Sequence, residues 1–271
     1  MSGDLLLAEG GCHLNSGCGF PAPDTSVFEF ASLLDIHLLG LTFHVTKPSL
    51  LLLFSAAVVV IFFVAAFRKA KVVPRGIQNL AEYGYLFVRE DIVRGTIGKQ
   101  GDPFVPILFT FFFFVWILNF MSILPFAQFP VTSRFAIPVA FALIIYFLWV
   151  PLGVMRHGLK FFKIMTMPPD VPKPMYILLV PIEILSNFIV RPFTHAVRLF
   201  ANMFAGHMLI VTFSVATWYL LSSSAVGIIG SGASFVVTVG LTGFEMLIQA
   251  LQAYVFTLLA AVYINDAVNA H

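Results

Sequence analysis

The sequence predicts an all-α integral membrane protein. Of its 271 residues, 59% are hydrophobic and 10% are charged, whereas about half of a soluble domain is apolar and about a quarter is charged. The 31 phenylalanines carry more apolar surface than the core of one globular domain can hold, so the bilayer must solvate most of it. A water-soluble enzyme is therefore excluded, and the net charge of +2 indicates no nucleic-acid partner.

Residues 1–46 form an amino-terminal segment ahead of the first long apolar run. Because no Lys or Arg precedes Lys47, the basic start of a signal peptide is missing and we expect the first crossing to act as its own insertion signal. The segment holds both cysteines, Cys12 and Cys18, which would be able to pair if the segment is extracytoplasmic. A zinc site needs four ligands and only His13 is near, so we expect no metal site.

The membrane domain, residues 47–271, begins with three uncharged runs of a length that suits single crossings. Residues 49–67, as a helix with a 1.5 Å rise per residue, cover about 29 Å, the thickness of a hydrocarbon core. Residues 104–126 and 139–155 are two further runs, and the short proline-containing loop between them predicts a helical hairpin.

The last two apolar runs are too long for upright crossings. As helices, residues 175–221 and 235–265 would extend about 70 Å and about 46 Å, against about 30 Å of hydrocarbon. Either both are steeply tilted or the first is broken. Hydropathy alone allows a break at Arg191-Pro192, because proline kinks or ends helices.

Basic residues are concentrated in two loops. Seven Lys and Arg lie in residues 68–102 and four in 156–174, whereas Lys47 and Arg134 are isolated. The positive-inside rule then places both loops in the cytoplasm. With five crossings, we expect the amino terminus outside the cell and the carboxyl terminus in the cytoplasm.

Within the first of these loops, residues 75–94 have the pattern of an amphipathic helix. Ile77 and Leu80 fall on one face, and Gln78 and Glu82 on another. The pattern fits a helix lying at the membrane interface. It also fits a solvated cytoplasmic helix, and the sequence leaves both open.

Ionisable residues inside the apolar runs are the candidates for function, because a charge at membrane depth costs several kcal/mol or more. At about 100° per residue, Arg191, His195, Arg198 and Asn202 fall on one stripe, which continues into small residues that would let another helix approach. The structural alternative is that Arg191 extends to the interface and that Arg198 pairs internally with Glu183.

A second polar stripe lies on the last apolar run. Its members are spaced three or four residues apart: Thr238, Thr242, Glu245, Gln249 and Gln252. Such a stripe needs water or a polar partner helix, and Glu245 needs a cation or water. His207 lies nine residues after Arg198, so it projects from the opposite side of that helix and is the natural partner of Glu245. A lone buried histidine is more often a hydrogen-bonded core residue, but a neighbouring glutamate favours a proton relay.

Residues 191–207, RPFTHAVRLFANMFAGH, and residues 244–266, FEMLIQALQAYVFTLLAAVYIND, resemble subunit a of F-type ATP synthases, in the membrane Fo sector. The resemblance implies that the last two runs are long, tilted, antiparallel helices curving around a ring of c subunits, which favours the unbroken interpretation of 175–221. It also implies peripheral-stalk b subunits as partners, a bacterial cell membrane as the location, no cofactor, and no catalysis by this chain alone.

The resemblance also implies roles for single residues. Arg198 corresponds to the essential stator arginine, Asn202 to the polar residue one turn later, and Gln252 to the glutamine that faces it. His207 and Glu245 correspond to the proton-path pair, in the order found in mitochondrial members, whereas many bacterial members have the reverse. Three further side chains are candidate accessory residues: His195, Gln249 and Glu183, the last without a role because its spacing to Arg191-Pro192 departs from the pattern.

The expected function is proton translocation through two aqueous half-channels to and from carboxylates of the ring, coupled to its rotation and to ATP synthesis. The chain has no Gly-rich phosphate loop, no HExxH and no GxSxG, so ATP chemistry and proteolysis on it are disfavoured. A proton-coupled secondary transporter is the alternative, although it would place a substrate site between internal repeats that we do not find. A purely structural anchor would not need Arg198 and Glu245 inside the bilayer.

Overall fold

The computed structural model describes residues 20, 22–23, 34–38, 41–68, 71–124, 127, 129–167, 175–221 and 224–269. Cys12 and Cys18 lie outside these residues. The chain divides into two compact units, which we call unit 1 and unit 2. Unit 1 comprises residues 1–57, 118–133 and 201–250, and unit 2 comprises residues 58–117, 134–200 and 251–271.

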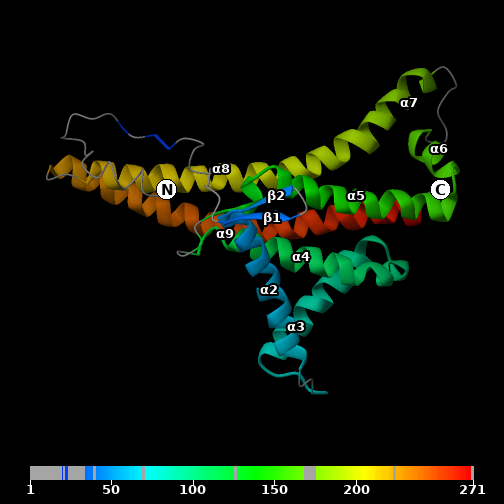
Figure 1. The fold of residues 1–271 in the computed structure, drawn as a ribbon, viewed down its shortest axis with the longest axis horizontal. Coiled ribbons are helices and arrows are strands. Elements are labelled where there is room, and N and C mark those ends of the chain that lie inside the picture. The colour runs from blue at the N-terminus through cyan, green and yellow to red at the C-terminus, as the bar shows by residue number, and fades with distance from the viewer. Residues whose placement is uncertain are drawn as a thin grey trace. The chain divides into compact units, whose positions relative to one another are not determined.

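Among the described residues, five helical stretches are long and apolar enough to cross a membrane. They are Lys47–Phe67, Lys99–Phe120, Ala136–His157, Tyr176–Leu220 and Ala225–Val268. In Figure 1 they correspond to α2 (Lys47–Phe67), α4 (Val105–Phe120, preceded by a 3₁₀ turn from Lys99), α5 (Ala136–His157), α7 with α8, and α9 (Ala225–Val268). The prediction of an all-α membrane domain with five membrane helices is confirmed for the described residues from Lys47 onward.

One helical region extends from Tyr176 to Leu220, so the break that hydropathy allowed at Arg191-Pro192 is wrong. It consists of α7 (Tyr176–Leu185), a π-helical segment (Ser186–Val190) and α8 (Arg191–Leu220). The backbone N–H of Arg191 bonds to the carbonyl of Ser186, five residues back. A π turn widens the helix locally, and here it does so just where Pro192 lacks an N–H, which lets the helix continue.

Within unit 1, α8 and α9 run antiparallel. The Ser231 hydroxyl donates to the carbonyl of Thr217 at 2.8 Å, and the Ser234 hydroxyl donates to the carbonyl of Phe213 at 2.9 Å. Residue numbers therefore rise along α9 as they fall along α8. The small serine side chains let the two backbones approach closely and still satisfy their own hydroxyls. The expected antiparallel pairing of the last two helices is confirmed in this unit.

The amphipathic region 75–94 is helical, as α3 (Ile77–Leu86) followed by a π-helical segment (Phe87–Arg94). The predicted faces are only partly right. Gln78 is 7% exposed, whereas Ile77 and Leu80 are about 60% exposed. Gln78 is drawn inward because its amide exchanges two hydrogen bonds with the backbone of Lys71, at 3.0 and 2.9 Å.

The amino-terminal segment contains a β-hairpin that was not predicted from the sequence. Strands β1 (Leu34–Leu38) and β2 (Leu41–Val45) pair antiparallel, with Leu34 opposite Val45 and Leu38 opposite Leu41. The two residues between them match the spacing of a tight hairpin. The sequences LDIHL and LTFHV alternate apolar and polar residues, which is the signal that would have identified the strands.

Two short helical elements lie on either side of α5 in the sequence. Helix α6 (Lys160–Thr166) follows α5 after two residues, and a single 3₁₀ turn (Val131–Ser133) precedes α5. Gly158, between α5 and α6, has φ of +61°, a conformation that only glycine adopts readily. This residue permits the sharp turn at the end of α5.

Candidate functional site

The polar residues of unit 1 gather around the Glu245 carboxyl group. The Ser122 hydroxyl donates to Glu245 Oε1 at 3.3 Å, and Gln249 Nε2 donates to Ser122 Oγ at 2.7 Å and to Glu245 Oε1 at 3.4 Å. All three residues are at most 6% exposed. We call this group the Glu245 cluster. It holds a carboxyl group in the interior with neutral hydrogen-bond donors around it.

Local sequence explains how the three members meet. Glu245 and Gln249 are four residues apart on α9, so they share one helix face. Ser122 lies just past the end of α4, where its backbone N–H bonds to the carbonyl of Asn119 at 3.0 Å. A Cβ atom on Gly206 of α8 would lie 3.5 Å from the Glu245 carboxyl carbon, so the backbone of α8 passes directly beside the carboxyl group.

A second buried polar pair lies in unit 1 at the end of α4. Thr132 Oγ1 donates to Asn119 Oδ1 at 2.8 Å, and both residues are fully buried. Asn119 Nδ2 and Gln249 Oε1 have no hydrogen-bond partner among the described residues. These atoms are free to bind water, as buried amide groups usually do.

Ser122, Asn119 and Thr132 were not among the site residues predicted from the sequence. Two of these are polar residues three apart in an otherwise apolar stretch, ILNFMSILPF, and that spacing was the available signal. Ser and Asn are common enough in membrane helices that their spacing alone does not identify a partner.

His207 lies where its spacing predicted. It is 8% exposed, whereas Arg198, nine residues earlier, is on the exposed side of α8. His207 directly follows Gly206, the residue whose backbone passes beside Glu245. A direct contact between His207 and Glu245 stays a prediction.

The exposed side of α8 carries Arg198 among small and polar residues. Between residues 194 and 205 the exposed residues are Thr194, Arg198, Ala201, Asn202 and Ala205. No hydrogen bond or ion pair of Arg198 occurs among the described residues. The structural alternative, pairing of Arg198 with Glu183, does not occur among the described residues. Glu183 Oε2 instead accepts a hydrogen bond from Asn187 Nδ2 at 3.0 Å, and Asn187 also donates to the carbonyl of Met165.

Arg191 and His195 contact α9 within unit 2. Arg191 pairs with Asp266 at 2.7 Å and lies 5.6 Å from the centre of the Tyr263 ring. Arg191 is therefore ion-paired within the chain, and its extension to the membrane interface stays a prediction. The interaction also makes α8 and α9 antiparallel in unit 2, since the start of one meets the end of the other.

His195 departs from the predicted stripe. It is 3% exposed, with its ring centre 4.0 Å from that of Phe256, whereas Arg198 on the same predicted face is exposed. Neither ring nitrogen of His195 has a hydrogen-bond partner among the described residues. Gln252, also in unit 2, is 3% exposed, and its expected place opposite Asn202 stays a prediction.

No group of three or more His, Cys, Asp and Glu side chains that would hold a metal ion occurs in the described part of the chain. The chemistry available at these residues is proton binding and charge compensation. Among the described residues of unit 1, the buried carboxyl group is that of Glu245. Arg198, in unit 2, is an arginine of a membrane-length helix that has no acidic partner among the described residues.

Comparison with known proteins identifies relatives over almost the whole sequence. Residues 49–265 match the family model for the ATP synthase A chain. An ATP synthase subunit a from Streptomyces lividans is 50% identical over 269 residues, covering 98% of this chain and 94% of that protein. The ATP synthase subunit a from Frankia alni is 43% identical, covering 92% of this chain and 86% of that protein. The ATP synthase subunit a from Hyphomonas neptunium is 39% identical, covering 90% of this chain and 94% of that protein.

Proposed function

The chain belongs to the ATP synthase A chain family and is a multi-pass membrane subunit of an F-type ATP synthase, and from this we propose that it is the stator proton channel of the complex. It carries protons to and from carboxyl groups of a ring of c subunits and performs no catalysis alone. The observation that carries the proposal is the Glu245 cluster, a buried carboxyl group with neutral partners on a membrane helix. Family membership disfavours the transporter and the structural anchor.

Arg198 supplies the fixed positive charge of the proposed mechanism. It lies on an exposed α8 face with small neighbours, so a partner helix is able to approach its guanidinium closely. A ring carboxyl group must be neutral while it passes through lipid. Brought against Arg198, the same group is stabilised in its ionised form, because the guanidinium stays protonated at every relevant pH and offers five donors.

The same charge blocks a direct proton leak. A proton moving straight between the outer and inner half-channels would have to pass a permanent cation, which repels it. Protons therefore cross only on the moving ring carboxyl groups. Asn202 lies one turn after Arg198 on α8, and Gln252 lies on α9. We propose that both residues orient the ring carboxyl group or a water molecule bound to it.

The Glu245 cluster and His207 form the proposed outer half-channel. Ser122 and Gln249 are neutral, so they hold the Glu245 carboxyl group in place without fixing its charge. A carboxyl group held in this way is able to take and release a proton as the gradient demands. Asn119 and Gln249 have amide atoms available for water next to this path, and His207 passes the proton on.

The membrane potential sets the scale of the work. Each proton gains about 2.3 kcal/mol per 100 mV of potential. Several protons must therefore be summed through rotation of the ring to make one ATP. A stator is therefore needed to couple each single proton transfer to a step of the rotor. A channel that let protons leak past the rotor would dissipate the gradient without making ATP.

We expect Ser122→Ala to slow proton-driven ATP synthesis severalfold. The loss of one hydrogen bond costs about 1 kcal/mol, and a barrier raised by that amount lowers a rate severalfold. The change removes a donor to Glu245 and an acceptor for Gln249 without adding charge or bulk. Ser55→Ala is the matched control, since Ser55 is also buried but bonds only the Leu51 carbonyl of its own helix. The measurement is ATP synthesis by purified complexes in vesicles under an imposed proton gradient. Equal rates in both variants would remove Ser122 from the proton path.

The orientation is tested by accessibility. A tag at the amino terminus is expected to react with a membrane-impermeant reagent from outside the cell, and a tag after His271 only after the membrane is opened. The positive-inside rule predicts that the basic loops lie in the cytoplasm, and five described helices are long and apolar enough to cross a membrane. If both tags react from the same side, the number of crossings or the assignment of sides is wrong.

A further inference from the structure

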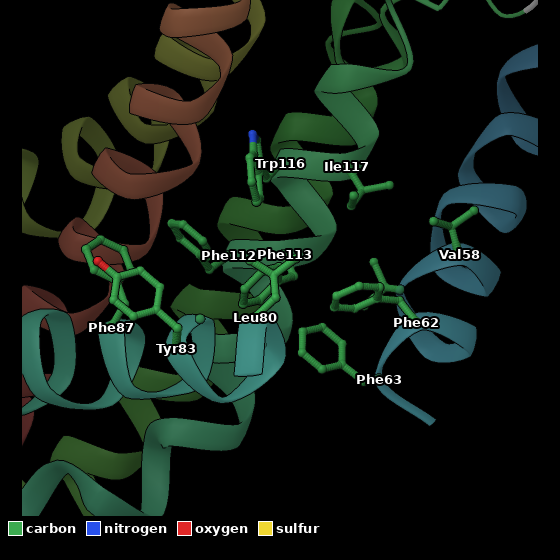
Figure 2. A pocket seen from close by; sticks show the side chains of 12 residues that line it. Val58, Phe62, Phe63, Leu80, Tyr83, Phe87, Phe112, Phe113, Trp116 and Ile117 are labelled. Carbon is green, nitrogen blue, oxygen red and sulfur yellow. The ribbon is translucent and has the colours of Figure 1, made fainter. Parts of the chain in front are cut away.

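Unit 2 contains an apolar cavity of about 490 Å³ between α2, α3 and α4 (Figure 2). Pockets that bind small molecules are about 300–1,000 Å³, so the cavity is large enough for part of a ligand. Each of the three helices contributes to its wall. Representative lining residues are Val58 and Phe62 from α2, Leu80 and Tyr83 from α3, and Phe113 and Trp116 from α4.

Aromatic contacts keep the walls of the cavity in place. The Phe63 ring lies 4.9 Å from the Phe113 ring and 4.7 Å from the Phe109 ring, which joins α2 to α4. Gly84 joins α3 to α4, since a Cβ atom there would lie only 2.7 Å from the Phe113 ring. The three helices therefore meet at defined points beside the cavity, which favours a built pocket over a gap that closes by small shifts.

The chemistry of the wall selects an apolar ligand. None of the described residues that line the cavity carries a charge, and all but Tyr83, Trp116 and Gly84 have purely hydrocarbon side chains. Water in such a space would have few partners. A hydrocarbon chain is the ligand type that a membrane supplies in excess.

A basic segment begins directly beyond the cavity. Arg68, Lys71 and Arg75 follow the end of α2 and are exposed. Arg68 comes five residues after Phe63, which lines the cavity, so along the helix it lies about 8 Å further on. That is the direction in which the polar end of a lipid would lie if its chain entered the cavity.

The basic segment is held against α3. The Gln78 amide bonds to the backbone N–H and carbonyl of Lys71, and its Nε2 also donates to Glu82 at 2.7 Å. Between the cations, Val72 and Val73 are fully and two-thirds exposed. Exposed valines flanked by basic residues are typical of a segment that rests at the membrane interface.

We propose that this cavity and basic segment form a binding site for an anionic phospholipid. One acyl chain fills the cavity, and the headgroup phosphate is bound by Arg68, Lys71 and Arg75. Anionic lipids favour such positions because a basic cluster next to a membrane helix attracts their charge, while a zwitterionic lipid gains no net attraction. The proposal does not depend on the proton path, since no residue of that path contributes to the site.

The test uses the purified ATP synthase complex in phosphatidylcholine vesicles. The probe is phosphatidylglycerol with a photoactivatable diazirine at the end of one acyl chain, and the comparison probe is phosphatidylcholine with the same diazirine. After illumination, mass spectrometry locates the labelled peptides. We expect the phosphatidylglycerol probe to label the cavity-lining part of α4 about fivefold or more above the phosphatidylcholine probe. A difference of this size corresponds to the attraction of the anionic headgroup to one basic side chain or more.

Two kinds of variant separate headgroup from chain. Arg68→Gln or Arg75→Gln is expected to lower phosphatidylglycerol labelling about fivefold, whereas Arg156→Gln, an exposed arginine at the end of α5, leaves it unchanged. Val59→Trp narrows the cavity and is expected to lower labelling by both probes. The amount of this chain in the purified complex confirms that each variant assembles.

Equal labelling by the two probes, or labelling of α4 that Arg68→Gln and Val59→Trp both leave intact, would overturn the proposal. So would occupation of the cavity by a protein helix. That outcome is detected by placing Val59→Cys in the complex, where efficient cross-linking of this cysteine to another subunit contradicts a lipid at the site.

Discussion

Replacing Arg198 with alanine is expected to reduce proton-driven ATP synthesis by about a hundredfold or more. The proposed function makes this guanidinium the only fixed partner of an ionised carboxyl group at membrane depth, and leaving such a charge without its partner costs about 3–5 kcal/mol. Insertion should be unaffected, because Arg198 makes no hydrogen bond or ion pair within the described chain. The measurement is ATP synthesis in vesicles that contain equal amounts of each complex.

A lysine at this position should restore little. An ammonium group loses its proton more readily when desolvated and lacks the planar fork that binds a carboxylate with two hydrogen bonds. Thr194→Ala is the matched control, since Thr194 lies on the same exposed face one turn earlier and its hydroxyl bonds the backbone of its own helix. Near-normal synthesis by Arg198→Ala, or an equal loss in Thr194→Ala, would contradict a specific role for the guanidinium.

Replacing Glu245 with glutamine is expected to slow proton-driven synthesis on the order of a hundredfold, the usual contribution of a positioned acid or base. Glutamine preserves an oxygen that accepts from Ser122 and Gln249, so the structure of the cluster is retained while the exchangeable proton is lost. His207→Leu should also slow synthesis, because the proposed relay then lacks its second member.

Exchanging the two residues tests whether they act together. The double variant His207→Glu with Glu245→His should recover more activity than either single variant retains, since the same two groups then stand on opposite helices. A double-mutant cycle on the synthesis rate, with membrane levels held equal, measures the coupling. Strictly additive losses with no recovery in the exchange would mean that His207 and Glu245 are independent, and water at Asn119 or Gln249 would be the next candidate partner.

The membrane helices were predictable because the bilayer imposes their length and composition. Each apolar run contains a helix whose ends lie within three residues of the predicted bounds, with two exceptions: α4 ends at Phe120 and not at residue 126, and α9 begins early. That helix begins at Ala225 and not at residue 235, because small and polar residues lower the hydropathy of its first turns. Ser231 and Ser234 bond carbonyl groups of α8, and a contact of this kind is invisible to a hydropathy scale.

The position of His195 was not predictable from helical spacing. With 100° per residue, Arg198 and His195 lie within about 60° of each other around the helix axis, so helical spacing assigns both residues to one stripe. Burial depends on where the neighbouring helix lies across that arc, and α9 covers His195 through Phe256 while Arg198 is left exposed. Similarly, the partners of Glu245 depend on the path of the chain after α4, which brings Ser122 to it from 123 residues away in sequence.

The most direct test of the proposed coupling is the number of ATP molecules made for each proton that crosses sealed vesicles containing the Arg198→Ala complex. Both quantities are measured under the same imposed gradient, with a vesicle lacking the complex as the baseline. If Arg198 both compensates the ring carboxyl group and blocks direct passage, protons continue to cross and the ratio falls close to zero. A ratio equal to that of the unaltered complex, or a proton flux that disappears together with synthesis, would contradict the proposed gate.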